Sequence, residues 1–131
     1  MKIKIIRFGS KSSNAKKYSQ DLYNLSKTQT DIYIRIRQKP YLAILEKNKL
    51  VACLWLEKDS DENDFSIITH PKYRNRGYAS MLVRELVHDR FVGKITSELC
   101  CEPINPTMRK IIKKYKFSPD FRNSDFWTFD I

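Results

Sequence analysis

The sequence has few of the residues that build metal sites or covalent cross-links. Its 131 residues include two histidines and three cysteines, Cys53, Cys100 and Cys101. An odd number of cysteines, two of them adjacent and none in a C-x-x-C pair, argues against a disulfide framework and against a structural zinc site. No histidine has a diagnostic spacing to the Cys100–Cys101 pair, so we interpret these two as buried strand residues. We predict a metal-free protein of the cytoplasm.

Long apolar runs are also missing. No stretch approaches the ~20 apolar residues that cross a bilayer, and no secretory signal precedes a small-residue cleavage site. Only three glycines and five prolines interrupt the chain, which has no internal repeat and no low-complexity linker. With 41% hydrophobic residues the chain can form one core, so we predict a single domain over residues 1–131 and no membrane association.

Acidic residues are scarce relative to basic ones. Fifteen Asp and Glu face 25 Lys and Arg, which gives a formal charge of +10. Such an excess favours a polyanionic partner, whether nucleic acid, an acidic surface or a phosphorylated cofactor, but it does not define a fold.

The hydrophobic periodicity predicts an α/β protein with a central antiparallel part. His70 to Asn75 is expected to be irregular, because Pro71 lacks an amide hydrogen and restrains its neighbour. The predicted strands are 2–8, 31–38, 41–45, 50–56, 65–69 and 94–101, the predicted helices are 15–25, 78–91 and 106–114, and an aromatic hairpin is expected over 121–131. Residues 46–49 and 57–64 are predicted turns, and Ser12 or Ser13 is the expected N-cap of the first helix.

The most specific segment runs from Thr69 to Ser80, between an expected strand and an expected helix, and reads T-H-P-K-Y-R-N-R-G-Y-A-S. Unpaired amides at the start of a helix lie at the positive end of its dipole and bind anions. Gly77 removes a side chain where a phosphate must approach the backbone, and Ala79 keeps a nearby position small. The spacing is not that of the loops that bind nucleoside triphosphates or dinucleotides. We therefore predict a phosphate site of another kind.

This segment resembles motif A of the GNAT superfamily of acyl-CoA-dependent N-acetyltransferases, R/Q-x-x-G-x-G/A. Arg74, Gly77 and Ala79 fill the fixed positions, and the frequent H-P-x-Y precedes them as residues 70–73. An ordinary basic loop that caps a helix is the alternative interpretation of the six-residue pattern. The preceding strand and the long following helix favour the motif.

A second stretch, residues 105–117, is similar to the motif B helix of the same superfamily. Asn105 opens it, and Phe117 lies at the family's interval. An amphipathic C-terminal helix with Ile111, Ile112 and Tyr115 in the core would show the same pattern, so this match is supporting evidence only.

The resemblance covers nearly the whole chain and implies a GNAT-like α+β fold, in which a mixed, centrally splayed sheet is flanked by helices. Acetyl-CoA would lie between the strand that ends at Thr69 and the strand that ends near Cys101. Backbone groups of Ile67, Ile68 and Thr69 would then pair with the pantetheine arm. The remaining cofactor-binding residues implied are Arg74, Asn75, Arg76, Gly77, Tyr78, Ala79 and Ser80 at the pyrophosphate, with Lys72 nearby, and Asn105 near the pantetheine arm.

The catalytic residues are where the sequence departs from the family. The tyrosine that ordinarily protonates the departing CoA thiolate falls in register at Ile112, which has no proton to give. Tyr115, one helical turn further on, is either the replacement acid or a core residue whose hydroxyl reaches the surface. Lys116 replaces the usual glycine and predicts a different end to this helix.

A proton acceptor is needed as well, because attack on the thioester requires a neutral amine. Glu102 is our candidate base, and Glu98, Glu62 and Asp64 are the alternatives. Each of these carboxylates can equally be a solvated surface group, and proximity of amine and thioester would then supply most of the acceleration.

The leading functional prediction is an N-acetyltransferase that moves the acetyl group of acetyl-CoA to a primary amine by direct attack in a ternary complex. The alternatives are a basic nucleic-acid-binding module and a catalytically degenerate acetyl-CoA-binding protein. The amine acceptor is a small molecule or a macromolecule, with an acidic or nucleic-acid-associated acceptor open, and the protein is expected to be a monomer or a homodimer.

Overall fold

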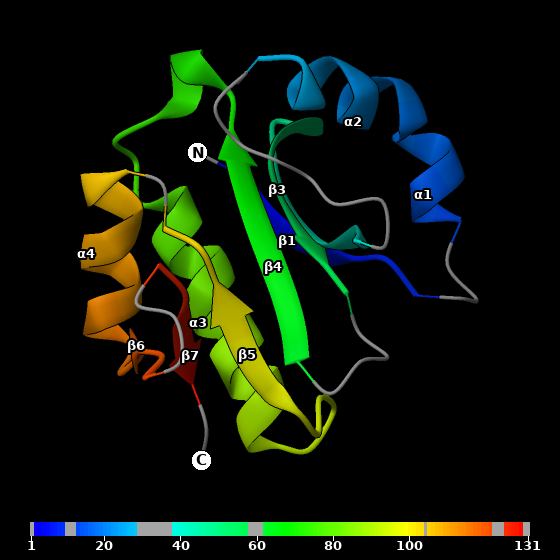
Figure 1. The fold of residues 1–131 in the computed structure, drawn as a ribbon. Coiled ribbons are helices and arrows are strands. Elements are labelled where there is room, and N and C mark those ends of the chain that lie inside the picture. Colours follow the sequence, from blue (N-terminus) through cyan, green and yellow to red (C-terminus); the bar gives the residue numbers. More distant parts are fainter. Residues whose placement is uncertain are drawn as a thin grey trace.

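The computed structural model describes residues 2–9, 13–28, 38–57, 62–103, 105–121 and 125–129. One mixed sheet forms its centre, with helices on both faces (Figure 1). The strands are β1 (Ile3–Arg7), β2 (Lys39–Glu46), β3 (Lys49–Leu56), β4 (Glu62–Thr69), β5 (Glu98–Cys101), β6 (Ser118–Pro119) and β7 (Trp127–Phe129). The helices are α1 (Asn14–Lys17), α2 (Ser19–Ser26), the 3-10 turn η1 (Pro71–Tyr73), α3 (Tyr78–Phe91) and α4 (Pro106–Lys114).

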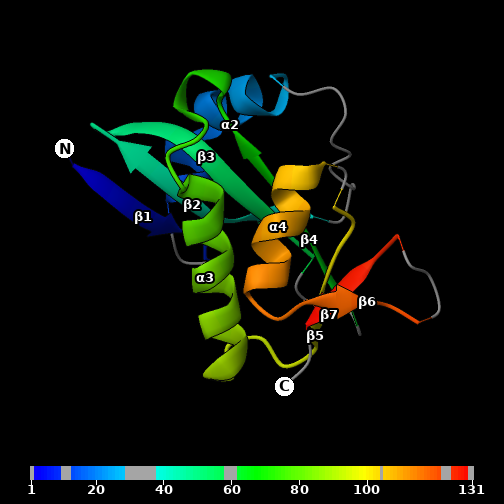
Figure 2. The same ribbon diagram turned by 90° about the vertical axis from the view of Figure 1, so that its left-hand side faces the viewer.

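The sheet has the strand order β1-β2-β3-β4-β5-β7-β6. Its described neighbours pair antiparallel except β4 and β5, which run parallel. Helices α1 and α2 cover one face, and α3 and α4 cover the other (Figure 2). The predicted α+β fold with a mixed sheet is therefore confirmed.

The sheet opens between its two parallel strands. Pairing of β4 with β5 is limited to three positions, from Glu62 opposite Glu98 to Asp64 opposite Cys100. Beyond this point β4 continues to Thr69, still paired with β3 on its other side. No strand of the described ranges pairs with the β5-facing edge of residues 65–69. The two strands thus separate as the splayed sheet requires.

The apolar residues of the sheet serve two cores, one on each face. The core under α3 and α4 includes Leu54, Phe65 and Leu82, and the core under α2 includes Cys53, Ile68 and Leu25. Alternate residues of β3 and β4 enter opposite cores because successive side chains of a strand point to opposite faces. Both faces of the central strands are therefore buried, which explains why β2 and β3 are almost continuously apolar.

Several boundaries differ from the predicted ones for local reasons. The β2–β3 hairpin turns on Lys47 and Asn48 alone, both with positive φ, which is the geometry that joins twisted strands most closely. β4 begins three residues earlier than predicted, because Glu62 to Asp64 pair with β5. β5 begins at Glu98 and not at Lys94, because the amides of Lys94 and Ile95 donate to the carbonyl of Asp89 and end α3 instead.

The first helix, the segment after Thr69 and the last hairpin also differ from their predicted form. The expected helix 15–25 is broken at Tyr18, whose φ of −107° and ψ of 17° separate α1 from α2. Ser13 precedes α1 but makes no side-chain cap. Pro71 opens a 3-10 turn where an irregular segment was expected, since a first helical position needs no amide hydrogen. Residues 31–37 of the predicted strand lie outside the described residues, and the last hairpin pairs β6 with β7.

Helix α4 ends at Lys114, where the sequence predicted, and its end has the geometry that a glycine usually supplies. The amide of Lys116 donates to the carbonyl of Lys113 at 3.1 Å, and the amide of Phe117 donates to that of Ile112 at 3.0 Å. These are the two bonds of a Schellman motif, and Lys116 takes its left-handed position with φ of 73°. The expectation that the lysine changes the helix end is therefore wrong.

Replacing Lys116 with glycine is expected to stabilise the protein by about 1 kcal/mol, because glycine adopts positive φ without the steric cost of a Cβ atom. Urea denaturation followed by circular dichroism measures the change. Lys113→Gly, three residues earlier within the helix, is the matched control and should destabilise by about 1 kcal/mol. A loss of stability in Lys116→Gly would contradict the assigned helix end.

An ion pair with a buried carboxylate and a partly exposed arginine ties the first strand to the end of α3. Asp89 is fully buried and accepts hydrogen bonds from both terminal nitrogens of Arg7, at 2.6 and 3.2 Å. The Tyr41 hydroxyl donates to the same carboxylate at 2.5 Å. The hydrogen bond to Asp89 raises the pKa of Arg7, and burial together with the same carboxylate raises the pKa of Tyr41. These hydrogen bonds fix the positions of β1, β2 and α3 relative to one another.

Candidate active site

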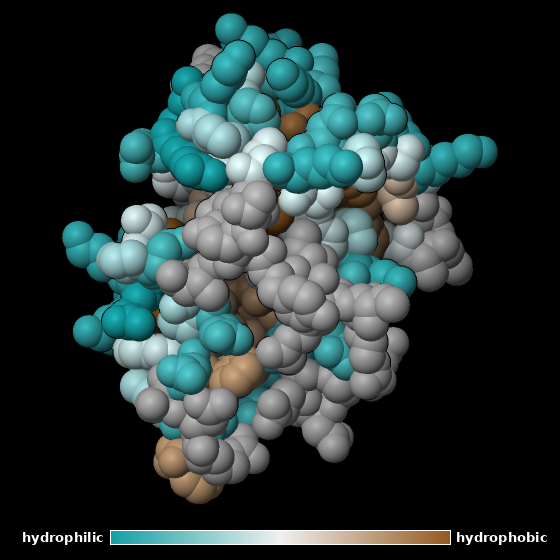
Figure 3. All heavy atoms as spheres, turned by 45° about the horizontal axis from the view of Figure 1, so that its top comes forward, coloured by the Kyte–Doolittle hydropathy of each residue, from teal (hydrophilic) through white to brown (hydrophobic). Residues whose placement is uncertain are grey.

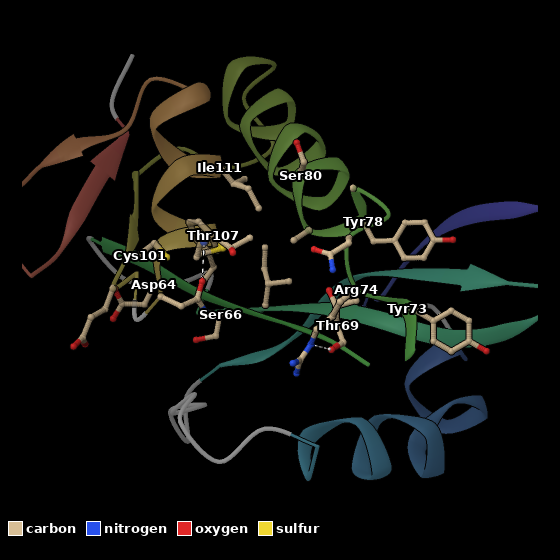
Figure 4. A pocket seen from close by; sticks show the side chains of 18 of the residues that line it. Asp64, Ser66, Thr69, Tyr73, Arg74, Tyr78, Ser80, Cys101, Thr107 and Ile111 are labelled. Carbon is tan, nitrogen blue, oxygen red and sulfur yellow. Dashed lines mark hydrogen bonds between the residues drawn. The ribbon is translucent and has the colours of Figure 1, made fainter. Parts of the chain in front are cut away.

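A cavity of about 640 Å³ lies where β4 and β5 separate. Its walls come from β4, the loop after η1, the first turn of α3, the end of β5 and the inner face of α4. In the space-filling view, hydrophobic side chains lie recessed between hydrophilic ones on this side of the molecule (Figure 3). The close-up shows residues of all these elements around one space (Figure 4). The part of the chain with the most specific sequence signal therefore lines this cavity.

The loop that leads into α3 has the backbone shape of an anion site. Asn75 and Gly77 both have positive φ, 64° and 80°, and Gly77 is the N-cap residue of α3. No side chain caps the first amides of this helix. Arg74, Asn75, Gly77, Tyr78, Ala79 and Ser80 all line the cavity. Alternation of conformations directs successive amides to one side, which is the concave geometry that holds phosphates.

The start of the loop is fixed by short-range hydrogen bonds. The Arg74 Nε donates to the carbonyl of Thr69 at 3.3 Å (Figure 4), which places a cation at the mouth of the cavity. The His70 Nδ1 accepts from the amide of Lys72 at 3.2 Å and so caps η1. Partial burial, followed by the nearby cations Lys49, Lys72 and Arg74, lowers the pKa of His70. A neutral imidazole at neutral pH keeps this cap intact.

Arg76 differs from the other loop residues because its side chain leaves the cavity. Its guanidinium binds Glu46 at 2.8 and 3.0 Å and stacks on the Tyr73 ring, 5.0 Å from the centroid. The buried Tyr78 donates its hydroxyl to the same carboxylate. These bonds, that of Tyr78 above all, lower the pKa of Glu46. Figure 4 shows the Tyr73 and Tyr78 side chains directed away from Cys101 and Ile111.

The β4 residues that were predicted to pair with the pantetheine arm divide between the two faces. Ile67 and Thr69 line the cavity, whereas the Ile68 side chain is fully buried in the core under α2. The carbonyl of Asp64 and the amide of His70 bond to β3, so with alternating residues the backbone groups of Ile68 also face β3, and those of Ile67 and Thr69 face β5. The predicted pantetheine contact through the backbone of Ile68 is therefore wrong. The edge toward β5 is the one without a paired strand among the described residues.

Helix α4 presents one face to the cavity. Asn105 lines the cavity and caps the helix, because its Oδ1 accepts from the amide of Met108 at 2.8 Å. Thr107, Met108 and Ile111 line the cavity as well. Their spacing along one helix face could have been derived from the sequence once Asn105 was taken as the N-cap. Ile112, at the position of the family tyrosine, is fully buried in the core and carries no acid.

Tyr115 reaches the cavity wall through a second residue. Its hydroxyl lies 3.2 Å from the Ser80 Oγ, within hydrogen-bond distance, and Ser80 lines the cavity. Tyr115 itself is the C-cap residue of α4 and packs against the core under α3 and α4. The ring of Tyr115 therefore packs in the core, and its hydroxyl lies beside the first turn of α3.

Two carboxylates line the opposite end of the cavity from Arg74. Asp64 is half-buried on β4, and Glu102 is exposed just after β5. Burial of the Cys101 thiol between them raises its pKa to about 12, with Asp64 and Glu102 adding to the effect. Of the other candidate bases, Glu98 does not line the cavity. All three cysteines are free and buried, as predicted, and so high a pKa leaves Cys101 a poor nucleophile at neutral pH.

Within the described ranges, no group of three or more histidine, cysteine or acidic residues is arranged to hold a metal ion. In the same ranges, no helix has the length and apolar character needed to cross a bilayer.

The fold and the cavity together define a class of protein: an α+β domain whose splayed parallel strands and anion-binding helix start form one site. The profile of the Acetyltransferase (GNAT) family matches residues 11–117. The chain belongs to this family, as its motifs indicated, and its chemistry is acetyl transfer from acetyl-CoA. No curated protein matches the chain by sequence.

Solved structures share the fold at low sequence identity. An N-acetyltransferase from Staphylococcus aureus superposes with a TM-score of 0.72 at 13% identity, covering 99% of both chains. A ribosomal-protein-alanine N-acetyltransferase from Brucella melitensis has a TM-score of 0.69 at 11% identity, covering 98% of this chain and 99% of its own. The PaiA N-acetyltransferase from Thermoplasma acidophilum, in complex with coenzyme A, has a TM-score of 0.69 at 12% identity, covering 98% and 97%.

Family membership confirms acetyl-CoA as the predicted co-substrate. It also favours a transferase over the alternative of a nucleic-acid-binding module, because the basic loop that suggested a polyanion is the one that lines the cavity.

Proposed function

We propose that this chain, acting as one domain, transfers the acetyl group of acetyl-CoA to a primary amine by direct attack in a ternary complex. The observation that carries the proposal is that two features are continuous. The edge of β4 that faces β5 leads directly into the loop around Gly77, which has a left-handed conformation. A strand edge offers hydrogen bonds to the amides of a pantetheine arm, and the loop offers amides to a pyrophosphate.

The cofactor residues have different roles in this proposal. Backbone groups of Ile67 and Thr69 hold the pantetheine arm, while the backbone of Ile68 bonds to β3 and supports the strand from behind. The amides from Asn75 to Ser80 hold the pyrophosphate. Arg74 contributes charge at the cavity mouth, while Arg76 acts indirectly, because its guanidinium is bound to Glu46. Asn105 holds the first turn of α4 against the pantetheine arm. Since exposed cations contribute little each, the backbone geometry of the loop supplies most of the affinity.

Tyr115 is proposed to support the cofactor loop and not to protonate the thiolate directly. Its hydroxyl lies 3.2 Å from the Ser80 Oγ, and the amide of Ser80 is one of those proposed to hold the pyrophosphate. The pantetheine arm separates the pyrophosphate from the sulfur, so neither hydroxyl reaches the departing thiolate. Water in the open cavity would then supply the proton, since Ile112 at the family position has none to give.

Tyr115→Phe and Ser80→Ala are each expected to raise the Kd for acetyl-CoA by roughly 5-fold while kcat changes little, since one hydrogen bond contributes about 1 kcal/mol. Calorimetry and steady-state kinetics measure the two effects. The double variant should lose no more affinity than the stronger single variant, because both remove the same hydrogen bond. A fall in kcat at unchanged Kd would contradict this role.

The amine proton is proposed to pass to Glu102, the candidate base that lines the acceptor end of the cavity, with Asp64 as its neighbour there. Glu102→Gln and Asp64→Asn separate the two carboxylates: the base is the one whose loss removes the acidic limb of the pH–rate profile.

The direct test of the function is acetyl-CoA-dependent formation of an acetylated amine, followed by mass spectrometry and by release of free CoA. Primary amines should react and tertiary amines of similar size should not. Binding of acetyl-CoA without any transfer would favour the catalytically degenerate alternative, and no binding at millimolar cofactor would refute both.

The location and the assembly of the protein are the last parts of the proposal. Three free cysteines and the use of acetyl-CoA favour action in the cytoplasm, either as a monomer or as a homodimer.

A further inference from the structure

Gln38 is a buried polar residue with an unsatisfied hydrogen-bond acceptor in the cavity wall. It lies just before β2, and only 6% of its surface is exposed. Its Oε1 is completely buried and has no hydrogen-bond partner among the described residues. Buried polar atoms in native proteins are nearly always paired, because an unpaired one loses the hydrogen bonds it would make with water. An exception in a residue that lines a cavity calls for a ligand, which would meet this oxygen once the side chain turns toward the cavity, because the oxygen itself has no accessible surface there.

The sheet register places Gln38 at the acceptor end of the cavity. Lys39 is opposite Leu56, and Leu56 is opposite Phe65, so Gln38 lies level with Asp64. Gln38 and Asp64 line the cavity together, and the phosphate-binding loop lies at the other end of β4. The Gln38 amide is therefore on the side of the cavity from which an acceptor substrate approaches the thioester, given the function proposed above.

The distance across the sheet indicates which part of the acceptor Gln38 meets. Neighbouring strands lie about 5 Å apart, so the backbone of β2 is about 10 Å from β4, and a thioester between β4 and β5 would lie a few ångströms further still. The glutamine side chain spans part of this gap. A group bound to its oxygen is consequently about 5 to 10 Å from the reacting nitrogen. This separation corresponds to a second functional group on the acceptor, several bonds from the amine.

We propose that Gln38 is an acceptor-binding residue, and that the acceptor is a small primary amine with a second hydrogen-bond donor, such as a hydroxyl or another amine. The inference rests on the proposed transferase function and specifies its substrate class. A site built to pair a buried polar group discriminates strongly against an analogue that lacks the partner, because the buried atom is then left unpaired. Specificity at this end of the cavity would come from the second hydrogen-bond donor of the acceptor and not from the length of its carbon chain.

Four acceptors of equal heavy-atom count test the inference. Two of them, 5-aminopentan-1-ol and 1,5-diaminopentane, carry a second donor, whereas hexylamine and 4-methoxybutylamine carry none. For the wild type, kcat/KM should be at least roughly 10-fold higher for the first two, in line with the cost of leaving a buried acceptor unpaired. Equal rates for all four, or a preference for 4-methoxybutylamine, would overturn the inference.

Gln38→Met tests the residue itself. Methionine has a similar shape without the acceptor, so the ratio between 5-aminopentan-1-ol and hexylamine should fall toward one. The same change should raise the Tm of the free protein, because it removes an unsatisfied buried oxygen, whereas loss of a structural residue would lower it. Gln38→Glu should shift the preference toward 1,5-diaminopentane. An unchanged ratio in Gln38→Met would overturn the assignment.

Asn63 provides a matched control elsewhere in the molecule. It is fully buried and its Oδ1 also lacks a partner, but it does not line the cavity. Asn63→Leu should therefore change stability without changing the acceptor ratio.

The two levels of the proposal fail separately. If acetyl-CoA binds and the four amines react equally, or none of them reacts, the inference about Gln38 is wrong and the cofactor site stands. If calorimetry shows no binding of acetyl-CoA to the wild type, the proposed function and the inference fall together.

Discussion

Replacing Gly77 with glutamate is expected to weaken acetyl-CoA binding by roughly 100-fold or more. The added carboxylate would lie beside the amides proposed to hold the pyrophosphate, and two like charges a few ångströms apart repel by a few kcal/mol at a protein surface. Gly77 also has φ of 80°, so any side chain there strains the loop. Calorimetry with acetyl-CoA measures the loss directly.

Gly93 is a matched control for the strain in this experiment. It has φ of 87°, and a Cβ atom at either glycine meets nothing within 4 Å. Gly93 follows α3 at its far end and does not line the cavity. Gly93→Glu should therefore destabilise the fold by about as much, roughly 1 kcal/mol, and leave acetyl-CoA binding unchanged. Equal affinity in the two folded variants would refute the assignment of the loop.

The largest expected effect on stability is that of Asp89→Ala, at about 3 kcal/mol. The change removes the buried carboxylate that accepts hydrogen bonds from Arg7 and from the Tyr41 hydroxyl, and hydrogen bonds to a charged group contribute about 1.5 to 3 kcal/mol. It also leaves a small cavity at a fully buried position. Urea denaturation at neutral pH gives the free energy of unfolding.

Glu85 is the natural comparison for this prediction. It accepts from the same Arg7 at 3.2 Å, but 32% of its side chain is exposed. Glu85→Ala should cost less than about 1 kcal/mol, because an exposed ion pair is screened by water. Similar losses for Asp89→Ala and Glu85→Ala would show that burial does not decide the strength of this network.

The loop between β4 and α3 and the start of α3 could be predicted from the sequence because the signal there is local. Gly77, Pro71 and the apolar stripe of α3 each restrict the backbone over a few residues, and no distant contact is needed to interpret them. The helix end at Lys116 was misjudged for the opposite reason. Its left-handed conformation is held by the packing of Phe117 in the core, which overrides the preference of a lysine.

The residues that complete the site could not be predicted, because they meet only through the sheet register. Glu46 belongs to a hairpin 30 residues from Arg76, and nothing near it in the sequence indicates a partner in the loop. Gln38 likewise reaches the cavity because β2 lies two strands from β4. Periodicity shows which face of an element is buried, but not which element lies opposite.

The edge of β4 that faces β5 affects how the protein without bound acetyl-CoA associates with other molecules. Unpaired strand edges are templates on which a further strand, from another molecule, can add. Among the described residues, no strand pairs with the β5-facing edge of β4 beyond Asp64, and the side chains of Phe65 and Ile67 that flank it are apolar. A bound pantetheine arm would occupy it and exclude a competing strand. Acetyl-CoA would then keep the chain from self-association as well as supply its acetyl group, so the tendency to aggregate should rise as the cofactor is withdrawn.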